Sequence, residues 1–515
     1  MNRVWLVAGF IGLLIAWGFG AHAPFVYDDK LEVIGNPSLR VYTDLRALLT
    51  YNVSRPLLIA SYAANWAVGG LDPFVYHLTS MGIHLVNVCL VGLVLAQRTS
   101  ARIAWCAALL WGVHPMCVQG VTYITGRSDA LCATFWLGAS YTWLRGHTRV
   151  TVGLVGAALL TKELAILLPV WLWLLRPEGY SRRFLAAMAA MVLGGAVTRV
   201  GFMGWPQVEV QRPLIDQFAS QGDAWTRYLT LWIVPFGQSI LHDPPLDGAR
   251  RILSAVLAVV WAYAIALLMF RWWRKRDDGL ALGGLLIACW VLPASAIPLK
   301  ETMAEHRAYL VGVPLIAALV TWLQKRQAMP MVAVAFVLFG ALTLRQNRLW
   351  SDEVLLWRRA AELYPQSADA TFGHADALRF AKRWADAEKG FRAVLELRPD
   401  DEHAAINLGI MRAEQGDEAG AAEIWTALSR THPTSCAAHN NLGAFALRQG
   451  QRRQAMDEYN SALQWCPTDP VALLNLGHLN WERGDTMVAR KYYVAYLENL
   501  PFGAEAALVR DRIGG

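Results

Sequence analysis

Long apolar runs constrain this chain more than any other feature. Runs of about 20 residues, the length of a helix that crosses a bilayer, begin near residues 4, 78, 102, 128, 184, 251, 279, 309 and 328, two of them being shorter. Hydrophobic residues make up 55% of the 515 residues, and the mean hydropathy is +0.30, which is high for a soluble globular protein. We therefore predict an all-α, polytopic membrane protein, with the first run kept as an anchor.

The run from 150 to 175 has arginines at both flanks and Lys162 and Glu163 in its middle. Since basic loops are usually cytoplasmic, we interpret it as a short hairpin whose turn lies on the far side, the alternative being one charged span. The hairpin gives a helical bundle of about eleven spans. The apolar segment 228–241 does not fit this count and is interpreted as interfacial or re-entrant.

This topology places four parts of the chain on the extracytoplasmic side. They are the loop 23–77, the loops that hold residues 114–129 and 299–309, and everything after residue 345. The formal net charge of +7 comes from short Arg and Lys clusters between the apolar runs, so it indicates topology and not a nucleic-acid partner. The seven cysteines form no CxxC pair, so neither a zinc module nor a thioredoxin-like site is indicated.

Beyond about residue 350 the sequence becomes polar and repeats itself every 34 residues. Small residues, an aromatic residue and a proline recur in one register, which is typical of tetratricopeptide helical hairpins that stack into an α-solenoid. We predict a transmembrane domain at 1–345, a linker at 346–366 and a repeat domain at 367–515, with four repeats over 367–500. The repeated prolines are Pro365, Pro399, Pro433, Pro467 and Pro501.

Three repeats carry an asparagine at one position, namely Asn407, Asn441 and Asn475. A row of amides on a concave face could bind the backbone of an extended peptide without reading its side chains. The alternative is that each asparagine braces the neighbouring repeat. Cys436 and Cys466 stand at adjacent ends of the third hairpin, so they could form a disulfide in an oxidising compartment or remain two free thiols.

The extracytoplasmic loops concentrate ionisable groups beside the membrane. Each one alone is more often a packed or surface residue, but ionisable groups at this depth usually mark a substrate path. Together they offer a carboxylate base and several cations for a phosphate, which is what glycosyl transfer from a lipid-linked phosphosugar requires. The candidates are Asp28, Asp29, Arg55, His77, His84, Arg127, Asp129, Lys162, Glu163, Glu305, His306 and Arg307.

Several segments, in this order, resemble one family. "FVYDDKLEVIGNPSL", "RPLLIASYAANWAVGGLDPFVYHLTSMGIHLVN", "LLWGVHPMCVQGVTYITGRSDALCATFW", "LLTKELAI" and "ETMAEHRAYL" precede the repeats. Nearly the whole chain is similar to the transmembrane and tetratricopeptide repeat-containing O-mannosyltransferases, relatives of the protein O-mannosyltransferases in the GT-C class. The resemblance implies a polyprenyl-phosphate-linked sugar donor, a Ser or Thr acceptor in a protein, and an acidic general base in the first extracytoplasmic loop.

On this resemblance the base is one of the pair Asp28 and Asp29, with Asp28 preferred and Asp29 orienting it or the acceptor. Arg127, Lys162 and Arg307 are the candidates to bind the donor phosphate. The family's "AERxLY" reads "AEHRAY" here, with His306 at the usual arginine position, which questions the role of Arg307. A single displacement predicts inversion at the anomeric carbon. We expect no cofactor and no essential metal, because there is no second carboxylate cluster.

Two other functions remain open from sequence alone. One is a non-catalytic membrane scaffold whose repeats gather partners for export or envelope assembly. The other is a GT-C transferase that acts on a glycolipid or polysaccharide. Arginine greatly outnumbers lysine, which suggests a GC-rich bacterial genome and hence an inner membrane with the repeats in the periplasm. In a eukaryote the same topology would place the repeats in the endoplasmic reticulum lumen.

Overall fold

A computed structural model describes residues 3–176, 181–203, 213–245, 247–296, 301–500, 503 and 505–514. The chain divides into two compact units, Met1–Leu356 and Trp357–Gly515. Within the described residues all regular structure is helical, apart from one antiparallel bridge between His242 and Met303. The predicted all-α class is confirmed.

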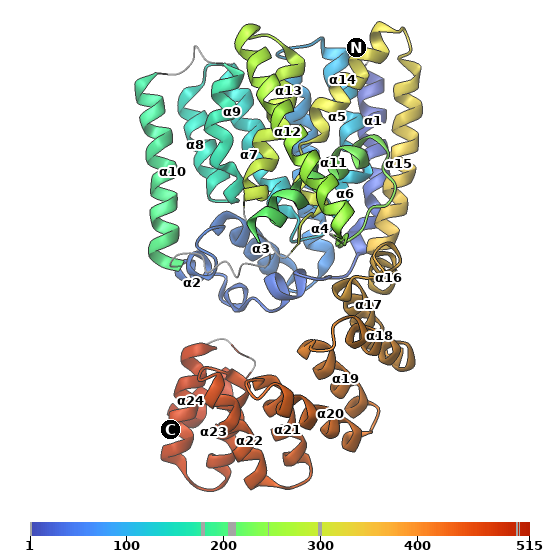
Figure 1. Ribbon diagram of the computed structural model, residues 1–515. Helices are drawn as coiled ribbons and strands as arrows, with labels where there is room; N and C mark the ends of the chain where they lie inside the picture. Colours follow the sequence, from blue (N-terminus) through green and yellow to red (C-terminus); the bar gives the residue numbers. More distant parts are fainter. Residues whose placement is uncertain are drawn as a thin grey trace. The chain divides into compact units, whose positions relative to one another are not determined.

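The first unit is a bundle whose long helices run side by side (Figure 1). Their apolar residues face both the bundle interior and the outside, as expected of helices surrounded by lipid. The main helices are α1 (Arg3–Gly18), α4 (Pro73–Leu95), α5 (Ala101–Gly112), α6 (Val118–Val121), α7 (Arg127–Leu144), α8 (Thr148–Leu159), α9 (Leu168–Leu175), α10 (Arg182–Met203), α11 (Leu214–Ile233), α12 (Gly248–Arg274), α13 (Gly279–Ala296), α14 (Gly312–Lys325) and α15 (Pro330–Trp350).

Several of these helices can cross a membrane. Four described segments, Val4–His22, Pro73–Leu95, Gly248–Arg274 and Pro330–Trp350, are long and apolar enough by themselves, and the bent pair around Ala101–Val121 could provide a fifth. Shorter apolar helices occupy the expected runs at 150–175 and near residues 184, 279 and 309. The chain is therefore a multi-pass membrane protein, while the count of eleven spans stays a prediction.

The two ambiguous runs differ in structure. Residues 148–175 form two short helical segments, α8 and the pair η5 (Glu163–Leu167) and α9, so the chain breaks at Lys162 as a hairpin requires. Residues 228–233 are the last turns of α11, and the segment after them leaves the helix. That non-helical segment ends at the bridge from His242 to Met303, so it lies against the loop before α14.

The first loop folds into short helices at one end of the bundle (Figure 1). These are η2 (Lys30–Ile34), η3 (Pro37–Val41), α2 (Leu45–Tyr51) and α3 (Pro56–Gly69). Asp44 accepts hydrogen bonds from two backbone amides at the start of α2, and Asp72 does the same for one amide at the start of α4. Such caps explain why the chain turns at these residues.

The second unit has the helical hairpins that the 34-residue period predicts. In three hairpins a glycine of the first helix packs against the aromatic residue of the second: Gly409 against Trp425, Gly443 against Tyr459 and Gly477 against Tyr493. The expected linker contains the end of α15 and a further helix, α16 (Glu353–Leu363). Pro501 lies outside the described residues. The other helices are α17 (Ala368–Phe380), α18 (Trp384–Leu397), α19 (Glu402–Glu414), α20 (Glu418–Thr431), α21 (Cys436–Arg448), α22 (Arg452–Trp465), α23 (Pro470–Glu482), α24 (Thr486–Asn499) and α25 (Ala506–Gly514).

Candidate active site

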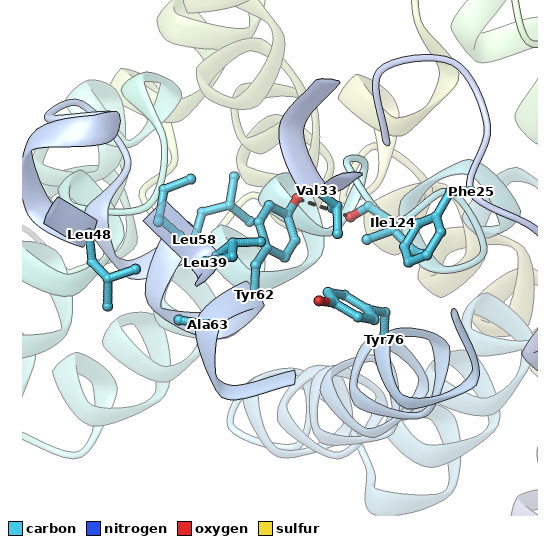
Figure 2. Close-up of a cluster of buried hydrophobic side chains, with 10 residues drawn as sticks. Phe25, Val33, Leu39, Leu48, Leu58, Tyr62, Ala63, Tyr76 and Ile124 are labelled. Atoms are coloured by element: carbon cyan, nitrogen blue, oxygen red, sulfur yellow. Dashed lines mark hydrogen bonds between the residues drawn. The ribbon is translucent and has the colours of Figure 1, made fainter. Parts of the chain in front are cut away.

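A buried hydrophobic cluster fixes the loop that carries the two aspartates. Figure 2 shows Phe25 and Val33 of the loop packed with Tyr62 of α3, Tyr76 of α4 and Ile124. The Tyr62 hydroxyl donates a hydrogen bond of 3.3 Å to the Ile124 carbonyl. Because these side chains are removed from water, each stabilises the loop by up to a few kcal/mol, and the loop is held against residues 123–125.

Asp29 is completely buried and holds two loops together. Its Oδ1 accepts hydrogen bonds from the backbone N–H of Thr125 at 2.8 Å and from the Thr125 hydroxyl at 2.6 Å, and its Oδ2 accepts from the Val26 N–H at 3.2 Å. Burial raises the pKa of Asp29 to about 7, although these hydrogen bonds oppose the shift. With both oxygens engaged by the protein, Asp29 is suited to orient its neighbour.

Asp28 is only partly buried and has a different set of neighbours. Its Oδ2 accepts a hydrogen bond of 2.9 Å from the Tyr123 hydroxyl. Burial raises the pKa of Asp28, while the Tyr123 hydrogen bond and the charges of Arg307 and Arg55 lower it. Of the two aspartates, Asp28 is the one with an oxygen left for a substrate hydroxyl, since Oδ1 accepts no hydrogen bond from the described residues.

Tyr27, directly before Asp28, has a left-handed backbone with φ of +51°. This conformation is unfavourable for a bulky residue and costs about 1–3 kcal/mol. The Tyr27 hydroxyl donates a hydrogen bond of 2.7 Å to Glu301 Oε1. Strain of this kind persists only where contacts enforce it, and here it sets the direction in which the next side chain, Asp28, leaves the backbone.

Lys162 and His306 lie on either side of a third aspartate, Asp129. Lys162 donates hydrogen bonds to Asp129, which is completely buried, and to Ser128 at 3.1 Å. His306 lies on the other side of Asp129, with 3.7 Å between its Nε2 and Oδ2 of the carboxylate. Burial and the nearby charges of Lys162 and Arg307 hold the pKa of His306 well below its usual value, so His306 is neutral at physiological pH.

Arg55 and Arg307 are the more accessible cations. Arg55 makes a bidentate ion pair with Glu163: its Nε donates to Oε1 at 3.2 Å and its Nη2 donates to Oε2 at 3.0 Å. Arg307 donates to the Glu301 carbonyl at 3.2 Å, and its side chain lies 3.7 Å from the Glu301 carboxylate. The altered motif "AEHRAY" had put the role of Arg307 in question. Glu301 connects Arg307 to Tyr27, and therefore to the strained turn before Asp28.

Arg127, a candidate for the donor phosphate, lies inside the bundle. Its side chain is completely buried, and its donors bind neutral oxygens, so in this structure it links α7 to the helices α3 and α4. Sequence alone could not separate these roles, because the partners lie far away in the chain. The acceptors are Ser80 Oγ, Ser61 Oγ, Asn65 Oδ1 and the Tyr76 carbonyl, and the guanidinium also lies over the rings of Tyr62 and Tyr76.

Three other candidates are also packing residues. His77 is hydrogen-bonded to the Ala23 carbonyl at 2.8 Å, and His84 contacts the Tyr309 hydroxyl and the Gly112 carbonyl inside the bundle. Glu305 is buried; its carboxylate accepts from His242 at 2.8 Å and also from the segment 238–239. Through these hydrogen bonds the three side chains fix helices and loops around the site.

Sequence reasoning missed four residues that complete the site. Tyr123 and Thr125 position the aspartates, and Tyr27 and Glu301 join Asp28 to Arg307. All four lie within the segments that carried the family resemblance, so the signal was the motif itself and not the residue type. Within the described ranges, no group of three or more His, Cys, Asp or Glu side chains is arranged to hold a metal ion.

The repeats contain a separate candidate site. The amides of Asn407, Asn441 and Asn475 each donate a hydrogen bond of 2.9 Å to the carbonyl four residues earlier. Asn441 and Asn475 line a hollow of about 780 Å³, whereas Asn407 does not belong to its lining. Cys436 and Cys466 also line it and are joined by a disulfide, with 6.2 Å between their Cα atoms.

Comparison with known proteins places this arrangement in context. The chain is 22% identical to human Protein O-mannosyl-transferase TMTC1 over 78% of its own length and 56% of that protein. It is 23% identical to mouse Protein O-mannosyl-transferase TMTC3, covering 75% of this chain and 50% of that one. The predicted resemblance is confirmed. This chain is similar in sequence to these protein O-mannosyl-transferases, and it spans about half the length of the curated relatives it matches.

No protein-family model matches the chain. Among solved structures, PilF of Pseudomonas aeruginosa aligns with 33% of this chain and 79% of its own, at 21% identity and a TM-score of 0.27. A MamA structure from Desulfovibrio magneticus aligns with 31% of this chain and 92% of its own, at 19% identity and a TM-score of 0.26.

Proposed function

We propose that the chain is an inverting glycosyltransferase that moves a hexose, most simply mannose, from a polyprenyl-phosphate carrier to Ser or Thr of exported proteins. The names of its relatives support a protein O-mannosyl-transferase. The carrier, the bacterial inner membrane and the periplasmic position of the repeats rest on the sequence reasoning above. The observation that carries the proposal is Asp28, which accepts a hydrogen bond from Tyr123 and is subject to the charges of Arg307 and Arg55.

In this mechanism Asp28 Oδ1 accepts the proton of the acceptor hydroxyl as the hydroxyl oxygen attacks the anomeric carbon. The bond from that carbon to the phosphate oxygen breaks, and its electrons leave with the lipid phosphate. General-base assistance of this kind is worth roughly 10²- to 10⁴-fold. One displacement inverts the anomeric carbon.

The cations stabilise the leaving phosphate. Arg307 and Arg55 are partly exposed, and both charges act on Asp28, so a phosphate near them would lie within reach of the same centre. Lys162 is more deeply placed and is bound to Asp129. We therefore assign direct contact with the phosphate to Arg307 and Arg55, while the more buried Lys162 adds positive charge at a greater distance. Charge-assisted hydrogen bonds to the phosphate strengthen as negative charge develops on it.

Asp28→Asn tests the assignment. Transfer of mannose from polyprenyl-phosphate mannose to a Ser- and Thr-containing peptide should fall by about 10²-fold or more, because the amide cannot take the proton. The matched control is Asp44→Asn, an exposed residue of the same loop that caps α2, since asparagine caps a helix equally well. In intact-mass analysis of exported proteins, the hexose should be lost in cells that express Asp28→Asn and kept in cells that express Asp44→Asn.

Two results would contradict the proposal. If Asp28→Asn transferred mannose within twofold of wild type, Asp28 would not be the base. If the wild type added no hexose to any exported protein while its repeats still captured partners, a non-catalytic scaffold would replace the transferase. A hexose found on lipid or polysaccharide instead would keep the enzyme and change its acceptor.

A further inference from the structure

The hollow in the repeat unit lies along the first helices of neighbouring hairpins. Its lining comes from α19 through Glu402, from α21 through Asn440, Asn441 and other residues, and from α23 through Asn475. A hollow of about 780 Å³ is larger than one side chain needs, and it follows the row of helices. Its shape therefore suits a segment of chain.

The amides along this hollow have hydrogen-bonding capacity left over. Asn441 and Asn475 each use one N–H for a carbonyl of their own helix, and their side-chain oxygens have no partner among the described residues. The side-chain oxygen of Asn440 is buried and also lacks a hydrogen-bond partner in the part of the chain that the structure describes. A buried acceptor without a donor is costly, so this wall of the hollow favours a ligand that brings N–H groups.

The charges of the hollow are not balanced. Glu402 and Asp469 line it, and neither carboxylate lies in an ion pair within the described residues. They accept hydrogen bonds from neutral groups only, Glu402 from Ser435 and Asp469 from Asn440. The one cation of the lining, Arg448, is already paired at 2.8 Å with Glu418, which does not belong to the lining.

We propose that this hollow binds an extended peptide that carries Lys or Arg side chains. The segments of other proteins to which this chain transfers sugar are therefore basic. The backbone of the peptide bonds to Asn441 and Asn475, and its cationic side chains approach Glu402 and Asp469. The amides alone would bind any extended backbone, whereas the two carboxylates add a preference for charge. That the bound peptide is the acceptor rests on the proposed transferase function; the binding itself does not.

The test measures binding of fluorescent peptides to the full-length protein in detergent by anisotropy, without any sugar donor. The peptides contain Ser and Thr and are identical except for lysine, glutamine or glutamate at the same positions. We expect the lysine peptide to bind the wild type best and the glutamate peptide worst. Glu402→Gln with Asp469→Asn should weaken binding of the lysine peptide by roughly 2- to 30-fold, because two partly exposed ion pairs are lost and each is worth about 0.2–1 kcal/mol.

Both substitutions preserve shape, since glutamine can still accept from Ser435 and asparagine can still cap α23. Glu423→Gln with Asp457→Asn is the matched control, because these exposed carboxylates lie on the second helices α20 and α22 and outside the lining. The control should bind the lysine peptide as the wild type does. Asn441→Ala with Asn475→Ala should weaken all three peptides alike.

Each outcome separates this inference from the proposed function. Equal binding of the three peptides, or an unchanged affinity in the Glu402 and Asp469 variant, would overturn the charge preference even if mannose transfer is observed. Lysine-selective binding by a protein that transfers no sugar would support the groove and refute the transferase. Transfer that is equally fast to lysine and glutamate peptides would show that the groove does not select the acceptor.

Discussion

Tyr123→Phe should move the pH dependence of transfer without abolishing it. The substitution removes the hydroxyl that donates a hydrogen bond of 2.9 Å to Asp28 Oδ2 and keeps the ring. That hydrogen bond lowers the pKa of Asp28, so its loss must raise the pKa further. A hydrogen bond to a charged group contributes about 1.5–3 kcal/mol, and Asp28 is partly exposed, so the lower value applies and corresponds to about one pKa unit.

The base acts only when it is deprotonated, so kcat/KM for mannose transfer rises with pH through the pKa of Asp28. In the Tyr123→Phe variant this rise should occur at a pH about one unit higher. At pH values above the shifted pKa, kcat/KM should be near that of the wild type. The assay is the pH profile of kcat/KM with saturating donor and varied peptide.

Tyr62→Phe is the matched control. The Tyr62 hydroxyl lies in the hydrophobic cluster that fixes the first loop, and it donates to the Ile124 carbonyl and not to Asp28. The control should keep the wild-type profile. A Tyr123→Phe profile that is unchanged, or displaced toward lower pH, would refute the role of Asp28 as the base that Tyr123 positions.

Two further predictions concern stability. The pKa of Asp29 is about 7 in the folded chain and near 3.8 when unfolded, so its stabilising contribution is present at low pH and is lost as the pH rises through about 7. Asp29→Asn should therefore flatten the decrease in thermal stability between about pH 4 and pH 7, and a slope equal to that of the wild type would contradict this. Reduction of the Cys436–Cys466 disulfide, which closes a separation of 30 residues, should lower the unfolding free energy of the repeat unit by about 3–4 kcal/mol. Thermal unfolding with and without reductant measures that loss, and a Cys436→Ala and Cys466→Ala variant should not respond to reductant.

The repeat unit was largely predictable because its information is local and periodic. Each glycine and its aromatic partner stand about half a repeat apart, so the periodic sequence by itself pairs Gly409 with Trp425. Apolar runs likewise identified the membrane helices. They did not fix the number of spans, because a short apolar helix such as α9 can be buried in a bundle or be part of a span.

The candidate site was predictable only as a set of loops. Motif order brought Asp28, Lys162 and Arg307 into one group, but it could not say which way each side chain points. Arg127 shows the limit: its partners are neutral oxygens on two other helices, and a guanidinium bound to such groups has the same sequence signature as one that binds phosphate. Asp29 and Asp28 are adjacent in sequence, yet only the contacts with Thr125 and Tyr123 give them different environments.

The packing of the first loop also affects the entropy of the catalytic cycle. Ordering the backbone of one residue costs about 1–2 kcal/mol, so a loop that condensed around each arriving donor would lose that free energy in every turnover. Here Phe25 and Val33 are buried with Tyr62, and Asp29 is bound to Thr125, all through the chain's own side chains. The loss of conformational freedom therefore occurs once, when the protein folds. Substrate binding energy then remains for stabilising the transition state, and amide hydrogens such as that of Thr125 should exchange with solvent as slowly as those of the bundle.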